Sequence, residues 1–441
     1  MSQNEVLESR FRSFVSDKAL MVVDTNPRAL QFISSLLTSM GVAEKSIYLC
    51  DSYDSAKVDI PKLKPSIILT DYDLDKKCGL NLIKMYRSSS NEPAQSIFIL
   101  VTANTSQVAV ARAAEEEVEG YVLKPFTGSI LRETIVKAAS TRFEPNEYER
   151  LIEEAKQLIA QGDLKTAEQV LETAKTKNPQ PALAHFYLGQ IELARKDYRA
   201  AQNRFQLGLK ANRIHCKCLI GLHEALLGQK EYSEAYATLK RFSRYFPLEP
   251  PILATMLKLA IQTKTYEDVE RLFRIFETVE EKSEELIRYV CAALVVCGKF
   301  YLQKTFRSRA LELFQHAVKT AQGNPRILKE VILVLAENQL KKEAELFLQF
   351  FPANFRESAD YFVAKIAVTD LNSDAKTVIE VGKEVLAKDV HEPPIYSILI
   401  KRMNETLDIA GAQDLSTEAL KRWPDQTERF QVTAPERKET K

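Results

Sequence analysis

Acidic side chains gather where a short apolar segment of the sequence ends. Residues 66–70 read SIILT, and Asp71, Asp73 and Asp75 follow at alternate positions, with Gly79 shortly after them. Carboxylates at this spacing repel one another, so each needs solvent, a cation or a hydrogen-bond donor. Oxygen ligands of this kind suit a hard divalent cation, above all Mg²⁺. The cluster therefore predicts a site that holds a cation.

Three more polar side chains stand at the ends of other apolar segments. Asp24, Thr102 and Lys124 each close a run of apolar, largely β-branched residues. If these runs are parallel strands, their carboxyl ends meet at one edge of a sheet, which is where ligands bind in such folds. An aspartate beside a metal ion and a lysine can attack a phosphoryl group and form an aspartyl phosphate. The set predicts phosphoryl chemistry at that edge.

The elements that must position these residues alternate between strand and helix. Five short apolar segments predict strands: 19–24, 46–50, 66–71, 96–102 and 120–124. The segments between them have helical periodicity; in residues 27–41, for example, Leu30, Ile33, Leu36 and Leu37 fall on one face. Alternating strands and helices predict an α/β domain with a parallel five-stranded sheet that helices cover on both faces.

Four motifs in this region resemble the receiver domain of bacterial two-component response regulators. They are VVDTNP (22–27), ILTDYDLDKKCGL (68–80), LVTAN (100–104) and GYVLKPF (120–126), and the resemblance extends over residues 18–140. It implies a flavodoxin-like fold with Asp71 as phosphoacceptor and Mg²⁺ as cofactor.

The resemblance also implies roles for the neighbouring residues. Asp24 and Asp71 would bind the metal through their carboxylates, and Asp73 through its backbone carbonyl. Thr102 would be the switch hydroxyl, Tyr121 the aromatic ring that moves with it, and Lys124 the partner of the phosphoryl group. The Lys124–Pro125 peptide bond would be cis.

Two positions depart from the family pattern. Thr25 stands where the family usually has a second acid, and Asp75 stands where proline is common. Loss of a carboxylate predicts weaker Mg²⁺ binding. A degenerate receiver that keeps the fold and never accepts phosphate is therefore an alternative.

The rest of the chain repeats every 34 residues. Small or β-branched residues recur at 167, 201, 235 and 269, and after a step of 41 residues the series resumes at 310, 344, 378 and 412. This period predicts about eight stacked helix pairs, with the seven extra residues lengthening one helix. The segment YLGQIELARKDYRAAQNRF (187–205) resembles a tetratricopeptide repeat, which implies an all-α superhelical solenoid. The predicted domains are a receiver (1–140), a linker (141–147), the repeats (148–430) and a polar tail (431–441).

Repeat geometry predicts which side chains line a peptide groove. They are Ile152, Lys156, Phe186, Gln190, Leu193, Ile220 and Glu224. The equivalent first-helix positions carry no asparagine, which disfavours a clamp for a carboxy-terminal carboxylate. The resemblance implies that a protein or peptide partner binds here.

Composition excludes several classes of function. The net charge is +1, from 61 basic and 60 acidic residues, which argues against nucleic acid as the main partner. The amino terminus lacks the apolar core of a signal peptide, and no apolar run is long enough to span a bilayer, so we expect a cytoplasmic protein without membrane insertion. After residue 140 no motif of an output enzyme occurs.

These observations predict a response regulator, a phosphoprotein in two-component phosphorelay signalling. A histidine kinase would phosphorylate Asp71, and the repeats would bind a partner protein as the output. Two alternatives stay open: a scaffold with a degenerate receiver, and a phosphate sink that acts on a shared kinase.

Overall fold

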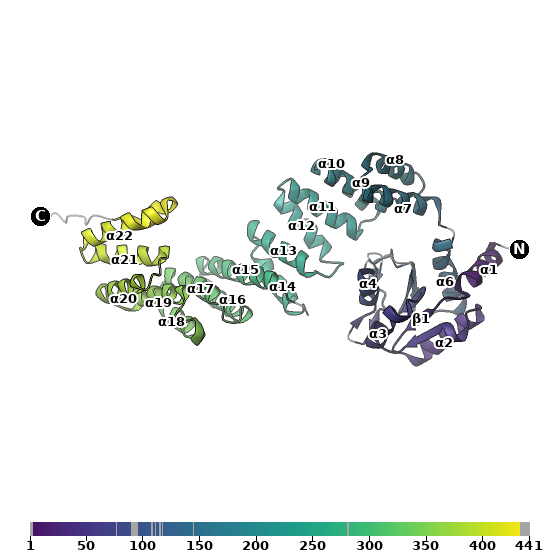
Figure 1. Cartoon of the computed structure of the whole chain (residues 1–441), viewed down its shortest axis with the longest axis horizontal. Coiled ribbons are helices and arrows are strands. Elements are labelled where there is room, and N and C mark those ends of the chain that lie inside the picture. The colour runs from purple at the N-terminus through teal and green to yellow at the C-terminus, as the bar shows by residue number, and fades with distance from the viewer. Residues whose placement is uncertain are drawn as a thin grey trace. The chain divides into compact units, whose positions relative to one another are not determined.

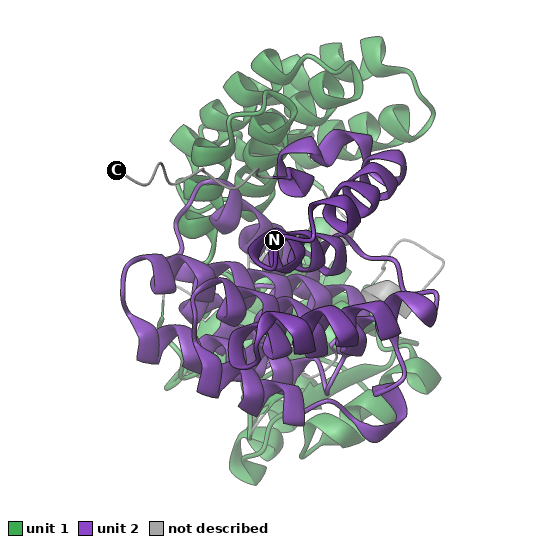
Figure 2. Cartoon of the chain, turned by 90° about the vertical axis from the view of Figure 1, so that its left-hand side faces the viewer, with its two compact units in different colours: residues 1–247 green, residues 248–441 purple. Residues whose placement is uncertain are grey.

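The structure is a computed structural model of the chain (Figure 1). It describes residues 3–75, 77–89, 96–106, 109–110, 112–113, 116, 118–143, 145–279 and 282–432. The chain divides into two compact units, residues 1–247 and 248–441, which Figure 2 shows in two colours. The boundary falls inside the repeats, whereas the sequence predicted one continuous repeat domain. Each unit is described by itself.

The first unit begins with the predicted parallel sheet. Its strands are β1 (Leu20–Val23), β2 (Ile47–Cys50), β3 (Ile67–Thr70), β6 (Ile97–Thr102) and β7 (Gly120–Leu123). Their order is β2-β1-β3-β6-β7 and every neighbouring pair is parallel, with Leu20 opposite both Ile47 and Ile67. A small antiparallel hairpin, β4 (Asp73–Leu74) with β5 (Lys77–Cys78), follows β3. The predicted α/β fold is confirmed.

Alternation along the strands divides the apolar side chains between two cores. Leu20 and Val22 face one core together with residues of α2 (Pro27–Ser39) and α6 (Gly128–Phe143). Met21 and Val23 face the other core with residues of α3 (Tyr53–Leu63) and α4 (Leu80–Ser89). Because successive strand residues point to opposite faces, a near-continuous apolar strand is what a doubly covered sheet requires.

A helix at the amino terminus, α1 (Gln3–Val15), was not predicted. Its side chains Phe11 and Val15 are 1% exposed and belong to the same core as α2 and α6. Glu8 lies 4.0 Å from Arg132 of α6, which also donates to the Ser39 hydroxyl at 2.8 Å. The helix therefore extends the core of the α/β region.

Helix α6 runs further than the predicted domain boundary. It ends at Phe143, and α7 begins at Glu147, so residues 141–143 of the predicted linker are helical. Asn146 begins α7 with a capping box: its side chain accepts from the Glu149 N–H, and the Glu149 carboxylate accepts from the Asn146 N–H. The separation between the two helices is therefore shorter than the sequence suggested.

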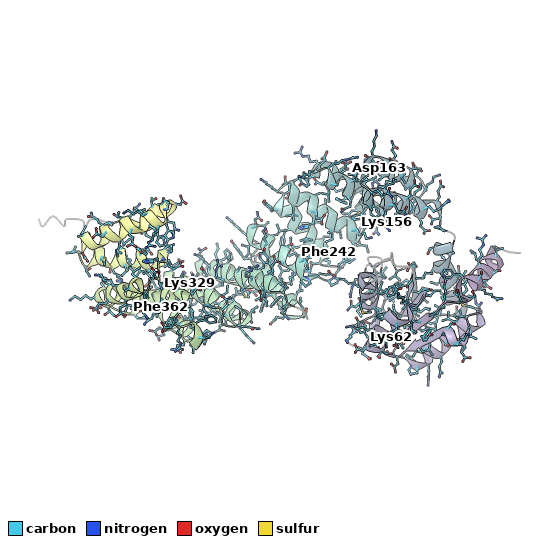
Figure 3. All side chains as sticks on the ribbon, in the orientation of Figure 1. Lys62, Lys156, Asp163, Phe242, Lys329 and Phe362 are labelled. Atoms are coloured by element: carbon cyan, nitrogen blue, oxygen red, sulfur yellow. The ribbon has the colours of Figure 1, made fainter. Side chains whose placement is uncertain are left out.

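Helix pairs follow, as the 34-residue period predicted. In the first unit they are α7 (Glu147–Ala160) with α8 (Leu164–Lys175), α9 (Ala182–Ala194) with α10 (Tyr198–Ala211), and α11 (Cys216–Gly228) with α12 (Tyr232–Phe242). Ala167, Ala201 and Ala235, which define the period, are fully buried. Asp163, labelled in Figure 3, caps α8, and Asp197 caps α10 one period later.

The second unit continues the pairs. They are α13 (Pro250–Gln262) with α14 (Glu267–Glu277), α15 (Glu284–Gln303) with α16 (Arg307–Thr320), α17 (Pro325–Glu337) with α18 (Lys341–Gln349), α19 (Ala359–Asn372) with α20 (Ala375–Ala387), and α21 (Pro393–Glu405) with α22 (Ile409–Arg422). The lengthened helix is α15, with 20 residues where α13 has 13. A 3₁₀ segment, η3 (Pro424–Phe430), ends the unit with Phe430 buried.

The turn inside each pair repeats one backbone conformation. Gly162 has φ of +84°, and the residues one, two and three periods later, Lys196, Lys230 and Lys264, have φ of 62°, 63° and 58°. This left-handed region suits glycine and costs other residues about 1–2 kcal/mol. Three lysines therefore hold a conformation that a glycine adopts in the first pair.

Candidate phosphoacceptor site

Asp71 follows β3 directly, and a glycine fixes its backbone. The Asp71 N–H donates to the Val23 carbonyl at 2.9 Å, and the Gly79 N–H donates to the Tyr72 carbonyl at 2.8 Å. A Cβ at position 79 would lie 1.9 Å from the Asp71 carbonyl oxygen and 2.7 Å from the Thr70 hydroxyl. Only glycine allows this approach, which explains why Gly79 follows the acidic cluster.

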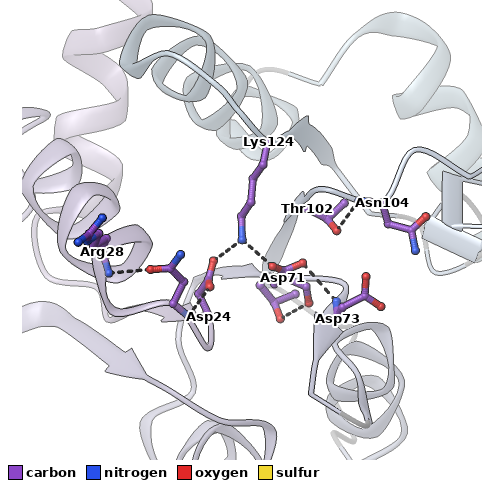
Figure 4. A network of polar contacts seen from close by, with 9 residues as sticks. Asp24, Arg28, Asp71, Asp73, Thr102, Asn104 and Lys124 are labelled. Atoms are coloured by element: carbon purple, nitrogen blue, oxygen red, sulfur yellow. Dashed lines mark hydrogen bonds and ion pairs between the residues drawn. The ribbon is translucent and has the colours of Figure 1, made fainter.

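The carboxylates of Asp71 and Asp24 meet at the ammonium group of Lys124 (Figure 4). Lys124 Nζ lies 2.6 Å from Asp24 Oδ2 and 2.5 Å from Asp71 Oδ2, and the Asp24 and Asp71 side chains are 3% and 13% exposed. Burial lowers the pKa of Lys124, but hydrogen bonds to the two carboxylates and their charges outweigh it, so the pKa is raised. The lysine is therefore a fixed cation between two acids.

The second oxygen of each carboxylate faces backbone N–H groups. Asp24 Oδ1 accepts from the Asn26 N–H at 2.8 Å, and Asp71 Oδ1 accepts from the Asp73 N–H at 3.2 Å. The Asp73 side chain itself is exposed. Asn26 also caps α2, because its side-chain oxygen accepts from the Arg28 N–H at 3.0 Å.

A chain of hydrogen bonds leads away from the site through Thr102. The Thr102 hydroxyl is buried and accepts from the Asn104 N–H at 3.1 Å, and the Tyr121 hydroxyl donates to the Asn104 carbonyl at 2.5 Å. Burial raises the pKa of Tyr121, and the charges of Asp71 and Asp73 raise it further. Asn104 therefore joins the two predicted switch residues, a role that the sequence alone did not indicate.

The comparisons with known proteins agree with this geometry. Residues 20–136 match the response regulator receiver domain family. Residues 20–136 are a receiver domain. Over 121 residues the chain is 26% identical to the chemotaxis protein CheY of Pseudomonas aeruginosa, covering 27% of this chain and 93% of that protein. It is 28% identical over 121 residues to CheY1 of Helicobacter pylori, covering 26% of this chain and 92% of that protein.

Solved structures with similar parts include both halves of the architecture. A two-component response regulator from Clostridium difficile covers 28% of this chain and 96% of its own, with 19% identity and a TM-score of 0.25. A tetratricopeptide repeat protein from Parabacteroides merdae covers 58% of this chain and 99% of its own, with 17% identity and a TM-score of 0.32. The assignment of the helix pairs rests on their own 34-residue arrangement.

Receiver domains bind Mg²⁺ at the phosphorylation site, and the donors of this receiver fit that ion. Asp24 and Asp71 carry one more charge than Lys124 neutralises. Mg²⁺ in proteins is usually held by one or two carboxylates together with water. Among the described residues, no three His, Cys, Asp or Glu side chains are placed to hold a metal ion. A bound ion would therefore depend on the two carboxylates, the Asp73 carbonyl and water.

Two contacts beside the receiver site were not predicted. Arg112 donates to the Tyr72 hydroxyl at 2.8 Å, and Lys77 of β5 lies 2.6 Å from Asp54 of α3. Each pair joins residues far apart in the sequence, so no local pattern reveals them. The two contacts attach the segment that follows Asp71 to Arg112 and to α3. The Lys124–Pro125 bond is cis, as predicted.

The predicted groove residues lie in different environments. Ile152 is 5% exposed and packs in the core of the first helix pair with Ala155, so its placement in an open groove was wrong. Lys156 pairs with Glu153 at 2.7 Å. Glu224 is exposed, yet partial desolvation raises its pKa. The remaining groove residues, Phe186, Gln190, Leu193 and Ile220, are half-buried, and their binding role stays a prediction.

Across the described residues, no helix is long and apolar enough to cross a membrane. Among the described residues, Cys216 and Cys218 are buried and form no disulfide, and the Cys218 sulfur lies 3.6 Å from the Ala182 carbonyl oxygen. Burial raises the pKa of Cys218 to about 12. At neutral pH such a thiol stays protonated and contributes to the packing of the helices.

Proposed function

We propose that this chain is a cytoplasmic response regulator in which Asp71 accepts a phosphoryl group from a histidine kinase and the helix pairs bind a partner protein. The observation that carries the proposal is the Lys124 ammonium bridging Asp24 and Asp71 at 2.6 and 2.5 Å. A buried carboxylate beside a fixed cation is poised for nucleophilic attack on phosphorus. No further catalytic activity is part of the proposal.

The transfer forms one bond and breaks another. An oxygen of Asp71 attacks the phosphorus of a phosphohistidine, the new P–O bond replaces the P–N bond, and the imidazole nitrogen keeps the electron pair. Lys124, already 2.5 Å from the carboxylate, would pair with the incoming phosphoryl oxygens. Mg²⁺, when bound, neutralises charge on those oxygens. Because Thr25 replaces an acid, we expect Mg²⁺ to bind weakly.

Thr102 would convert the new charge into a conformational change. The hydroxyl now accepts from the Asn104 N–H. If it turns to donate to a phosphoryl oxygen, the Asn104 segment is free to shift, and the acceptor of the Tyr121 hydroxyl shifts with it. A phosphoryl group acts in this way when it biases an element with two arrangements.

An exposed apolar surface near Lys124 supports a protein as phosphoryl donor. Phe32 of α2 and Ile130 of α6 are 47% and 51% exposed. The Phe32 ring lies 5.8 Å from that of Phe126, two residues after Lys124. Contiguous exposed apolar side chains of this kind mark protein contact sites. The histidine kinase would dock here.

Phosphorylation in vitro tests the proposal. The full chain is incubated with acetyl phosphate and Mg²⁺, and its intact mass is followed over time. We expect wild type and Asp73→Asn to gain one phosphoryl group and Asp71→Asn to gain none, because the Asp73 side chain is exposed and only its N–H contacts Asp71. No gain in wild type would favour the scaffold alternative, and a phosphoryl group gained from acetyl phosphate but lost within seconds would favour the phosphate sink.

A further inference from the structure

Four cations gather at one edge of the second and third helix pairs. Lys210 lies in the last turn of α10, Arg213 in the loop before α11, Arg241 in the last turn of α12, and Arg244 two residues after that helix ends. The Arg241 guanidinium donates to the Arg213 carbonyl, which joins the end of α12 to that loop. The Arg244 N–H in turn donates to the Arg241 carbonyl at 3.3 Å. We call these four residues the basic edge.

The basic edge stands in a stretch of sequence from which acids are missing. Residues 198–223 contain five basic residues and no acidic one, and residues 235–248 contain three basic residues and no acidic one. These runs belong to α10, α11 and α12, which follow one another in Figure 1. The balanced composition of the whole chain conceals this local excess.

Cations where the first helix pair meets the second show how such charges are normally balanced. Lys175 lies 2.5 Å from Glu172, Arg204 lies 2.9 Å from the same glutamate, and Arg195 lies 2.8 Å from Glu168. Among the described residues, no carboxylate lies within 4.0 Å of a side-chain nitrogen of any member of the basic edge. The two regions use the same residue types and differ in whether a carboxylate is present.

Helix dipoles account for only part of the basic edge. Lys210 and Arg241 lie in the last turns of α10 and α12, where a cation is favoured. Arg213 lies two residues before His215, which caps the N-terminus of α11, and a cation is unfavourable at that end of a helix. The exposed residue Arg213 therefore calls for another explanation.

An aromatic ring lies beside the basic edge. Phe186 of α9 is half-buried. The centroid of its ring lies 6.5 Å from the centroid of the His215 ring and 5.9 Å from the Lys217 ammonium nitrogen. The His215 Nδ1 accepts from the Cys218 N–H at 3.2 Å, which fixes the imidazole next to the loop that carries Arg213. A partner that covers the basic edge would thus also meet apolar surface.

We propose that the basic edge binds a short acidic segment of a partner protein, with an apolar residue of that segment against Phe186. The proposal rests on the proposed function of the helix pairs as a protein-binding output. Three of the four cations are arginines, whose planar guanidinium matches a carboxylate with two parallel hydrogen bonds. Glu224, Glu231, Glu234 and Glu249 flank the two acid-free runs in the sequence. They disfavour a long polyanion such as nucleic acid, which contacts many successive phosphates.

Fluorescence anisotropy with a labelled peptide tests this proposal on the full chain. The probe is a short peptide of aspartates and glutamates around one phenylalanine; the comparison probes are its amide counterpart of asparagine and glutamine, a single-stranded oligonucleotide, and phosphatidylserine vesicles. The test variant is the double substitution Arg213→Glu and Arg244→Glu. The matched control is Lys165→Glu and Arg199→Glu, which reverses two exposed charges outside the basic edge. Circular dichroism checks that both variants are folded.

We expect the acidic peptide to bind wild type and the control alike, and to bind the test variant at least about tenfold more weakly. Binding should weaken with salt, and the amide peptide should not bind. Equal binding to test and control variants would overturn the proposal. So would tighter binding of the oligonucleotide or the vesicles with the same sensitivity to Arg213 and Arg244. Phosphorylation of Asp71, measured on the same samples, reports separately on the proposed function.

Discussion

The receiver and the helix pairs are stabilised in different ways, and the difference decides what each reveals about function. At the receiver site a few buried charges depend on one another: Asp24 and Asp71 share one ammonium, and Gly79 holds the backbone of Asp71. In the helix pairs the recurring residues, such as Ala167, Ala201 and Ala235, are all apolar core. A site built from interdependent charges identifies its chemistry, whereas a repeated core identifies only the fold. Single substitutions should therefore have large effects in the receiver and small effects in the repeats.

Removal of the shared cation should have the largest effect. In Lys124→Met two buried carboxylates lose their counterion, which typically costs about 3–5 kcal/mol. The matched control is Lys77→Met, which breaks an exposed ion pair with Asp54 and should cost at most about 1 kcal/mol. Urea unfolding measures both, and Mg²⁺ should restore part of the stability of Lys124→Met. An equal decrease in the free energy of unfolding of the two variants would contradict the idea that the buried charges of the receiver site depend on one another.

The sign of the pH dependence follows from the raised pKa of Lys124. The group stays protonated in the folded state to higher pH than in the unfolded state. Its contribution to stability is therefore complete below the unfolded pKa of about 10.4 and is lost as the pH rises through the folded value. In wild type the free energy of unfolding should therefore fall from this cause only at alkaline pH. In Lys124→Met this alkaline decrease should be absent.

Substitution of Gly79 should have the next largest effect. In Gly79→Ala the new Cβ lies 1.9 Å from the Asp71 carbonyl oxygen, so the backbone at the phosphoacceptor must move. We expect the free energy of unfolding to fall by about 3 kcal/mol, at the upper end of overpacking costs. Phosphorylation should be much slower. Gly162→Ala is the control, because its Cβ meets nothing within 4 Å and only its φ of +84° opposes the change. The free energy of unfolding of Gly162→Ala should fall by about 1 kcal/mol, and this variant should be phosphorylated as fast as wild type.

Restoration of an acid beside Asp24 should have a moderate effect. Thr25→Asp adds a charge next to the acidic pair, so Mg²⁺ affinity should rise about tenfold, which is about 1.4 kcal/mol. Thr25→Asn has a similar shape without the charge and serves as the control. Isothermal titration with Mg²⁺ measures both affinities. A similar gain in Thr25→Asn would show that charge at position 25 does not limit binding.

The smallest effect is expected in a repeat turn, and it should be favourable. Lys264 has φ of 58°, so Lys264→Gly removes the cost of a left-handed side-chain residue and should stabilise the second unit by about 0.5–1 kcal/mol. Lys258→Gly, in the interior of α13, the helix before this turn, should destabilise the second unit by about 1 kcal/mol. Thermal unfolding compares the two, and destabilisation by both would mean that Lys264 has contacts worth more than its backbone cost.

Local patterns in the sequence predicted most of the fold. Each predicted strand differs from the observed one by at most one residue at either end, because apolar runs in a doubly covered sheet are hard to mistake. The seven extra residues did lengthen one helix, α15. The carboxyl ends of the strands brought Asp24, Asp71 and Lys124 together as expected.

What the sequence did not predict depends on contacts between distant residues. Helix α1 shows only a short stripe of Leu7, Phe11 and Val15, and its burial depends on the surface that α2 and α6 provide. The Arg112–Tyr72 contact spans 40 positions. Ile152 was misplaced because repeat geometry gives the face of a helix, and the packing of α7 against its neighbours turned that residue into the core.

The central claim is that phosphorylation of Asp71 reaches the helix pairs. Helix α6 ends three residues before Asn146, which caps α7. Helix α7 contacts both α9 and the loop before it: the Tyr148 hydroxyl accepts from the Ala184 N–H at 3.2 Å, and Glu147 lies 3.0 Å from Lys177. A change in the position of α6 should therefore alter the structure or stability of residues 145–200. Coupling between sites of this kind is typically about 1–3 kcal/mol.

Hydrogen exchange with and without beryllofluoride and Mg²⁺ measures this coupling directly. We expect altered protection in residues 145–200 of the wild type and no such change in Asp71→Asn or in Thr102→Ala. Changes confined to residues 18–130 of the wild type would contradict it, because the receiver would then respond to the phosphoryl mimic without any effect on the helix pairs.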